Sequence, residues 1–464
     1  AYVDALRTMA QGVGAAYRQT VAAPAFTADC FASDEGARAC ADKTIRDLGR
    51  RAFRRTIDDR EVTALLAVYD AGRDTGPDGD VAGRMAAGMD YTVRALVQSP
   101  HFIFRTELGP TDVTSGPSSL TPFELASALS YGIIASPPDA DLLAAAEGNQ
   151  LATPDQIGAQ VRRLIAARPD RFKAMVSDFV TEWLSIDFDK PAWTKDTTFY
   201  PLFSTALKTT FQQETQAFLG DWVDGGSTLS ALLTSTDGFV SSANAPVYGM
   251  TSSSATLQKT PLPAGQRAGI LTQPSFLGSA AHIDGSSPVY RGLAIMSQFL
   301  CKVPPPVPAV VPPLPTIDKS NIKTTRQRYQ LHATAAFCAA CHSQFDPMGF
   351  TFENYDGIGA WRSQENGMPI DSSGAIVGLT GGDKPVANAV EMAQALAASP
   401  DVQSCFARQV FRFDIGRTET DADSCAVDQY TTAFTDKGLD LRELLVAIAS
   451  SPTFQTRTAI MGGP

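Results

Sequence analysis

The sequence predicts a mainly α, multi-module helical protein with long irregular loops. Apolar residues recur at spacings of three and four along most of the chain, which is the period of an amphipathic helix. The alternating pattern of half-buried strands is nearly absent. The chain has 464 residues, roughly two to four times a typical domain. We therefore expect several cores, or one core with accessory lobes.

Helix-start signals define the first two modules. Residues 1–110 have helical patterning throughout, with Asp58 as a candidate cap. Thr121-Pro122-Phe123-Glu124 is a capping box with proline at the first helical position, and residues 153–156 repeat this device. We expect an N-terminal helical module at 1–110 and a second helical module at 119–245.

The composition changes in the second half of the chain. Residues 234–266 are rich in Ser, Thr, Gly and Pro, which is typical of irregular loops. A helix expected at 289–300 is followed by the proline-rich stretch 301–315, which excludes helix and favours a stiff extended strap. Composition leaves open whether this strap is a linker or lies against its neighbours. We expect a third module at 264–370 and a C-terminal helical module at 380–464.

Charge and hydropathy exclude two broad classes. The net charge of −11 and pI near 4.9 argue against a general nucleic-acid binder, which needs clustered Lys and Arg. No apolar run approaches the roughly 20 residues that span a bilayer, so we expect no transmembrane segment. The sequence starts at Ala1 without a Met, which we interpret as a mature chain whose signal peptide has been removed.

Seven cysteines suggest an oxidising compartment. Cys30 and Cys40 are close enough in sequence to close a small loop, and Cys405 and Cys425 flank a segment that could fold back. We expect both pairs to be disulfides, with Cys301 unpaired. The alternative for each pair is two separate buried thiols.

The motif Cys338-Ala339-Ala340-Cys341-His342 points to covalent haem. Two thiols at this spacing form thioethers to the haem vinyl groups, and the histidine reaches the iron as proximal ligand. A thioredoxin-like pair would need a preceding strand, and a zinc site would need two further ligands. The motif occurs once and the chain has four histidines, so we predict one covalent haem c and no multihaem wire within the chain.

The sequence after the motif resembles a known family. Residues 341–362 read CHSQFDPMGFTFENYDGIGAWR and closely resemble the haem segment of the large planctomycete-type cytochrome c family, secreted proteins built of domains of unknown function. The resemblance continues in other segments from about residue 48 to 454. These are FRR at 53–55, VQSPHFIFR at 97–105, FELA at 123–126 with LSY at 129–131 and Leu142-Leu143, SPVYRG at 287–292, the strap CKVPPPVP at 301–308, and RQVFRF at 408–413 with Gly416-Arg417.

The resemblance implies a small cytochrome c-like haem module in a protein located in the periplasm, at the cell surface or outside the cell. It supplies no established reaction, so function depends on the sixth iron ligand. A filled sixth position suits an electron carrier, and an open one suits an enzyme.

The candidates for the sixth ligand are His101, His332 and Met348. Met348 follows His342 by six residues, which is short for reaching the opposite haem face, so we interpret it as packing on the proximal side. His101 and His332 lie in segments that resemble the family and are the better candidates, although His101 could equally be a core or helix-end histidine. The remaining candidates have weaker support: His282, Met250, Met296, Met368 and Met392.

Propionate contacts are expected near the motif. Arg326, Arg328, Trp361 and Arg362 carry donors that suit buried carboxylates. The three carboxylates after the motif are instead expected to cap turns around glycines. These are Asp346, Glu353 and Asp356.

The favoured function is electron transfer by an exported monohaem cytochrome, with redox proteins or copies of itself as partners. One alternative is a haem enzyme of peroxidase or oxygenase type with an open distal site. Another is a structural or assembly protein in which the haem mainly stabilises a small domain.

Overall fold

The computed structural model describes residues 2–20, 28–110, 116–307, 323–334 and 336–459. The chain divides into two compact units, which are described separately below. Unit 1 comprises residues 1–167 and 449–464, and unit 2 comprises residues 168–448. The four-module division expected from the sequence remains a prediction.

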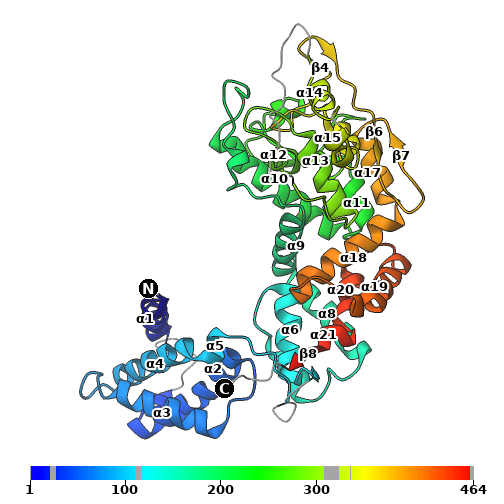
Figure 1. Cartoon of the computed structure of the whole chain (residues 1–464). Helices are drawn as coiled ribbons and strands as arrows, with labels where there is room; N and C mark the ends of the chain where they lie inside the picture. The colour runs from blue at the N-terminus through cyan, green and yellow to red at the C-terminus, as the bar shows by residue number, and fades with distance from the viewer. Residues whose placement is uncertain (1, 21–27, 111–115, 308–322, 335, 460–464) are drawn as a thin grey trace. The chain divides into compact units, whose positions relative to one another are not determined.

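Unit 1 is helical, with one short two-stranded sheet. Its strands β1 (Gly116–Ser119) and β8 (Thr456–Ala459) pair antiparallel, with Gly116 opposite Ala459. Its helices are shown in Figure 1: α1 (Tyr2–Thr20), α2 (Asp34–Phe53), α3 (Asp59–Arg73), α4 (Val81–Gln98), α5 (Pro100–Ile103), α6 (Pro122–Ile134), α7 (Ala140–Glu147), α8 (Pro154–Ala167) and α21 (Pro452–Gln455).

Three of the described helices of unit 1 open with the predicted caps, including the reciprocal Thr153–Gln156 pair at the start of α8. Asp58 accepts hydrogen bonds from the backbone N–H groups of Arg60 and Glu61, and the Glu61 carboxylate accepts from the Asp58 N–H. Thr121 and Glu124 make the same reciprocal pair at the start of α6. Each box satisfies backbone donors that a helix N-terminus otherwise leaves unpaired.

Unit 2 contains the segment with the Cys-x-x-Cys-His motif. Its mainly helical structure confirms the predicted fold class. Its helices are α9 (Pro169–Trp183), α10 (Thr205–Asp224), α11 (Leu229–Thr234), α12 (Pro274–Ser279), α13 (Pro288–Ala294), the π-helix Ile295–Phe299, α14 (Thr325–His332), α15 (Ala336–His342), α16 (Asp346–Gly349), α17 (Ala389–Ala397), α18 (Pro400–Ile415), α19 (Ser424–Asp436) and α20 (Leu441–Ala449).

Three small hairpins lie between the helices of unit 2. Residues 234–266, expected as irregular loops, contain β2 (Asp237–Val240) paired with β3 (Gln258–Pro261). Neither strand sequence, DGFV or QKTP, alternates polar and apolar residues, so the two-residue pattern that predicts a strand is missing. The other hairpins pair β4 (Gln364–Glu365) with β5 (Met368–Pro369) and β6 (Gly374–Ile376) with β7 (Lys384–Val386).

The disulfides correct one sequence expectation. Cys30–Cys40 is present as predicted, but Cys405 pairs with Cys301 at a Cα–Cα distance of 5.5 Å. Cys425 is a free, exposed thiol. Cys405 lies on the buried side of α18 and Cys301 adopts a left-handed φ of 52° just after the π-helix. Sequence proximity suggested Cys425, whereas packing of the π-helix against α18 brings Cys301 close.

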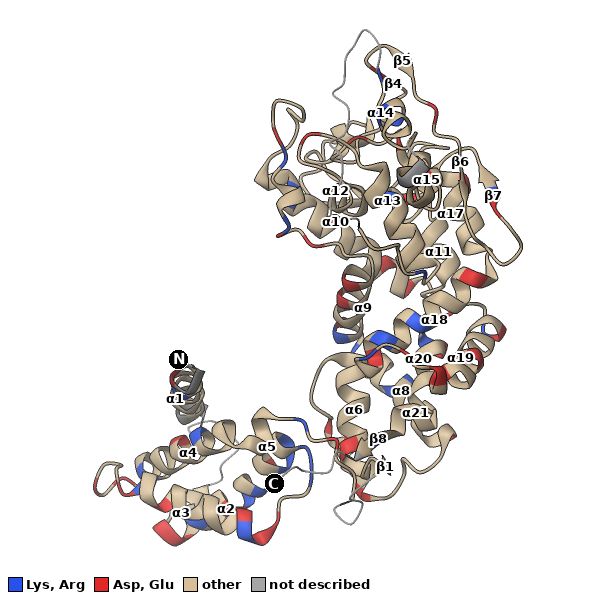
Figure 2. Cartoon of the chain, in the orientation of Figure 1, with Lys and Arg blue, Asp and Glu red and all other residues tan. Residues whose placement is uncertain are grey.

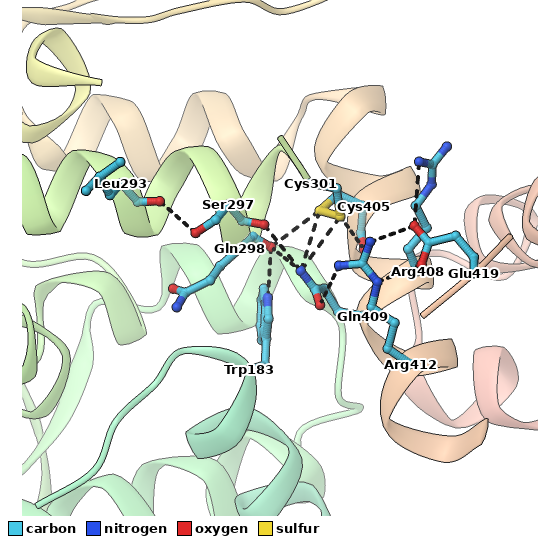
Figure 3. Close-up of a disulfide and its surroundings, with 10 residues drawn as sticks. All are labelled: Trp183, Leu293, Ser297, Gln298, Cys301, Cys405, Arg408, Gln409, Arg412 and Glu419. Atoms are coloured by element: carbon cyan, nitrogen blue, oxygen red, sulfur yellow. Dashed lines mark hydrogen bonds and ion pairs between the residues drawn. A yellow bond between two sulfur atoms is a disulfide. The ribbon is translucent and has the colours of Figure 1, made fainter. Parts of the chain in front are cut away.

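Hydrogen bonds around the Cys301–Cys405 disulfide connect α9, the π-helix and α18 (Figure 3). The Gln298 carbonyl accepts a hydrogen bond of 2.8 Å from the Trp183 indole N–H. The Gln409 amide N–H lies 3.7 Å from the Cys301 sulfur. Beside it, Arg412 forms a bidentate pair with Glu419.

Charges are interspersed over both units, as Figure 2 shows. Acidic and basic residues are scattered among many helices and loops, so the net charge of −11 does not come from one acidic run. Among the helices described, none is both long and apolar enough to cross a membrane. Of the proline-rich strap, residues 301–307 lie outside regular secondary structure, and 308–322 lie outside the described residues.

Candidate haem-binding site

Helix α15 carries the whole Cys-x-x-Cys-His motif. Cys338 and Cys341 are three residues apart and thus lie on the same side of the helix. Both are free, half-buried thiols. Helix α14, rather than a strand, precedes this segment in the described chain, which differs from the strand-first context of a thioredoxin-like pair.

His342 is fixed by a carboxylate four residues later. Its Nδ1 lies 2.9 Å from Asp346 Oδ2, and their side chains are 16% and 5% exposed. Burial raises the pKa of Asp346 to about 6, an effect that the charge of His342 opposes. With Nδ1–H donating to the carboxylate, the lone pair is on Nε2, the nitrogen available to a metal. The sequence pattern assigned Asp346 to turn capping and missed this contact.

Two glycines set the position of the segment after the motif. A Cβ added at Gly292 would collide with the Phe345 carbonyl oxygen, and one added at Gly349 would collide with that of Pro288. Helices α13 and α16 therefore cross with their backbones in contact. This crossing fixes Asp346, which is the first residue of α16.

A fully buried arginine holds the loop that follows. Arg291 is 0% exposed and donates to the carbonyl oxygens of Phe352 and Tyr355 at 2.8 Å and of Asp356 at 2.7 Å. Burial lowers the pKa of Arg291, and Glu353 opposes this effect. The guanidinium satisfies three carbonyls that an irregular loop would otherwise bury unpaired.

Two further histidines are located near the motif. The His332 ring centroid lies 5.3 Å from that of His342, with the planes at 76°. His282 Nε2 lies 3.3 Å from the hydroxyl of Tyr329, on the same helix as His332. Burial lowers the pKa of both His282 and His332. His282, the weakest histidine candidate from sequence, is thus linked to α14 by a contact that no local pattern reveals.

The other sixth-ligand candidates have different surroundings. His101 belongs to unit 1, where its ring lies 5.3 Å from that of Phe53 and its Nε2 lies 3.7 Å from Glu61. Met348 is 0% exposed within unit 2. The sixth ligand therefore remains a prediction.

The candidate propionate partners contact protein groups. Arg362 forms ion pairs with Glu353 at 3.3 Å and Glu365 at 3.1 Å. Arg326 donates to two backbone carbonyls at 3.0 and 2.6 Å, and its guanidinium lies over the Phe350 ring. The Trp361 ring packs against Tyr355, with centroids 5.3 Å apart.

The residues present fit a covalent haem. The donor set is two unpaired thiols and one imidazole whose second nitrogen is already hydrogen-bonded. Ile283, Tyr290 and Leu331 are large apolar side chains, each 49% exposed, on segments that adjoin His282 and His332. Apolar surface of this kind is stabilised when a porphyrin covers it.

Four family models match successive parts of the chain, and each describes a protein of unknown function. They are DUF1595 at residues 40–107, DUF1592 at 120–250, DUF1588 at 267–365 and DUF1585 at 382–454. The third contains the Cys-x-x-Cys-His helix. No curated protein and no solved structure matches the chain. These four domains are those associated with planctomycete cytochromes c, and the chain belongs to that planctomycete-type cytochrome c family.

Proposed function

We propose that this protein is an exported cytochrome with one covalent haem c that transfers single electrons. The observation that carries the proposal is the combination on α15 of two unpaired thiols with His342, whose Nδ1 is held 2.9 Å from Asp346. Two disulfides support a location outside the reducing cytoplasm. The partner is a redox protein or another copy of this chain.

Each part of the site has a separate task. Cys338 and Cys341 would form the thioethers, and His342 would ligate the iron through Nε2. When bound, the haem supplies an iron that alternates between the ferric and ferrous states. The glycine contacts between α13 and α16 and the Arg291 hydrogen bonds hold the ligand segment in one place. A rigid ligand segment limits reorganisation during electron transfer, which suits a carrier.

Covalent attachment is tested by intact mass and absorption spectra of protein expressed with a haem-attachment system. The unmodified chain is expected to gain the mass of one haem. Cys338→Ser with Cys341→Ser should abolish covalent haem, whereas Cys425→Ser removes an exposed free thiol and should retain it. A haem-free unmodified chain, or equal loss in the Cys425 variant, would overturn the assignment.

Electron transfer is tested by rapid mixing of reduced protein with an oxidised, positively charged acceptor. The net charge of −11 predicts faster transfer at low ionic strength than at high ionic strength. Exogenous ligands distinguish a carrier from a haem enzyme. Slow or absent binding of cyanide and carbon monoxide is expected of the carrier, while rapid binding together with peroxide turnover would favour the enzyme.

A further inference from the structure

We propose that Asp346 is a positioning residue that gives His342 partial imidazolate character and thereby lowers the reduction potential of the haem. The inference rests on the proposed function and extends it from the presence of a haem to the tuning of that haem. Asp346 would not touch the iron itself. It would act through the imidazole that does.

The contact is short and shielded from water. Asp346 Oδ2 lies 2.9 Å from His342 Nδ1, and the Asp346 side chain is 5% exposed. Its other oxygen, Oδ1, is buried and has no hydrogen-bond partner among the residues that the structure describes. The carboxylate therefore directs its interaction at one donor, the Nδ1–H group of His342. A charge-assisted hydrogen bond is strengthened in such surroundings.

The backbone holds the pair in this geometry. Asp346 begins α16, whose Gly349 touches the Pro288 carbonyl of α13. The ring centroid of Phe345 lies 5.1 Å from that of His342. Since neither partner sits on an exposed loop, the hydrogen bond is built into the packing of the motif segment.

The expected effect follows from ligand basicity. An imidazole that donates Nδ1–H to a carboxylate becomes a stronger donor through Nε2. A stronger donor stabilises ferric over ferrous iron, so the potential falls. Asparagine retains a neutral acceptor without the charge, and leucine removes both. The predicted order of potentials is unmodified protein, then Asp346→Asn, then Asp346→Leu as the highest.

The test is a redox titration of the three holoproteins. We expect Asp346→Asn to raise the ferrous-to-ferric ratio at fixed applied potential by about tenfold, equivalent to about 59 mV for a one-electron couple, and Asp346→Leu to raise the ratio further. Asp224→Asn is the matched control, because Asp224 is a 65% exposed carboxylate elsewhere in unit 2. It should change the ratio much less than either Asp346 variant does.

Two outcomes would overturn the role of Asp346. One is an unchanged potential in haem-bearing Asp346→Asn. The other is an equal rise in both Asp346 variants, because removal of charge alone predicts equality. If the unmodified protein carries no haem, the proposed function fails first and the two failures are distinguishable by mass.

A second readout depends on the imidazole alone. The chain has four histidines, so selective nitrogen-15 labelling gives few ring signals. In reduced protein, the Nδ1 signal of His342 should move away from the imidazolate value in Asp346→Asn. An unmoved signal would overturn the inference, and this measurement decides the question if Asp346→Leu fails to fold.

Discussion

Removal of the Cys301–Cys405 disulfide should strongly destabilise unit 2. The bond joins residues 104 apart. In the chain-entropy relation, a closed loop of this size contributes about 4.7 kcal/mol by restricting the unfolded chain. The Cys30–Cys40 bond spans 10 residues, and the same relation gives about 2.7 kcal/mol. Removal of the Cys301–Cys405 bond should therefore lower the free energy of unfolding by about 2 kcal/mol more than removal of the Cys30–Cys40 bond.

The tryptophans make the assay specific to unit 2. All four, Trp183, Trp193, Trp222 and Trp361, belong to residues 168–448. Urea unfolding followed by tryptophan fluorescence therefore reports the unit that holds Cys301 and Cys405. The double variant with alanine at both positions should unfold at lower urea concentration with a similar slope.

The matched control replaces Cys30 and Cys40 by alanine. Because these cysteines lie in unit 1, the tryptophan transition should keep its midpoint. Two results would refute the reasoning: a loss below about 1 kcal/mol in the Cys301 and Cys405 variant, against the roughly 4.7 expected, or equal shifts in both double variants.

Two further predictions concern buried groups of unit 2. Burial lowers the pKa of Lys195 to about 7, so between pH 7 and 10 the unfolded chain binds a proton that the folded chain lacks, and stability rises with pH by up to about 1.4 kcal/mol per pH unit. Lys195→Met should remove this rise in unfolding titrations, and an identical pH slope in the variant would contradict the assignment. Gly349→Ala should cost about 1–3 kcal/mol, because its methyl group meets the Pro288 carbonyl. Gly381→Ala, with open space around the added methyl group, is the control in the same fluorescence assay, and equal stability of the two variants would show that α16 can shift freely.

Local signals in the sequence predicted much of the fold. The capping boxes at Asp58 and Thr121 depend on side chains three residues apart, so the local sequence is enough to predict these helix starts. The haem motif is equally local. Helical periodicity also predicted the fold class, because amphipathic faces repeat within each element.

The sequence pattern did not predict contacts between segments that are far apart in the chain. The Cys301–Cys405 pairing depends on how the π-helix packs against α18, and sequence separation favoured the wrong partner, Cys425. The approach of His282 to Tyr329 spans 47 residues and has no periodic signature. The Asp346 contact spans only four residues, but His342 ends α15 and Asp346 begins α16, so the spacing within one helix does not predict it. The glycines that follow Asp346 in the sequence favoured a turn interpretation instead.

The Cys301–Cys405 disulfide also places the Cys-x-x-Cys-His segment inside a covalent ring. Residues 302–404 include all of α14, α15 and α16, so Cys338 and Cys341 lie inside the closed loop. Val303 and Val307, at the start of the strap, are 88% and 81% exposed, which makes this stretch accessible to proteases. A single cut there would open the ring without dividing the molecule, because the two sulfurs still join the pieces. The peptide with the Cys-x-x-Cys-His motif would stay attached to the rest of the protein until the disulfide is reduced.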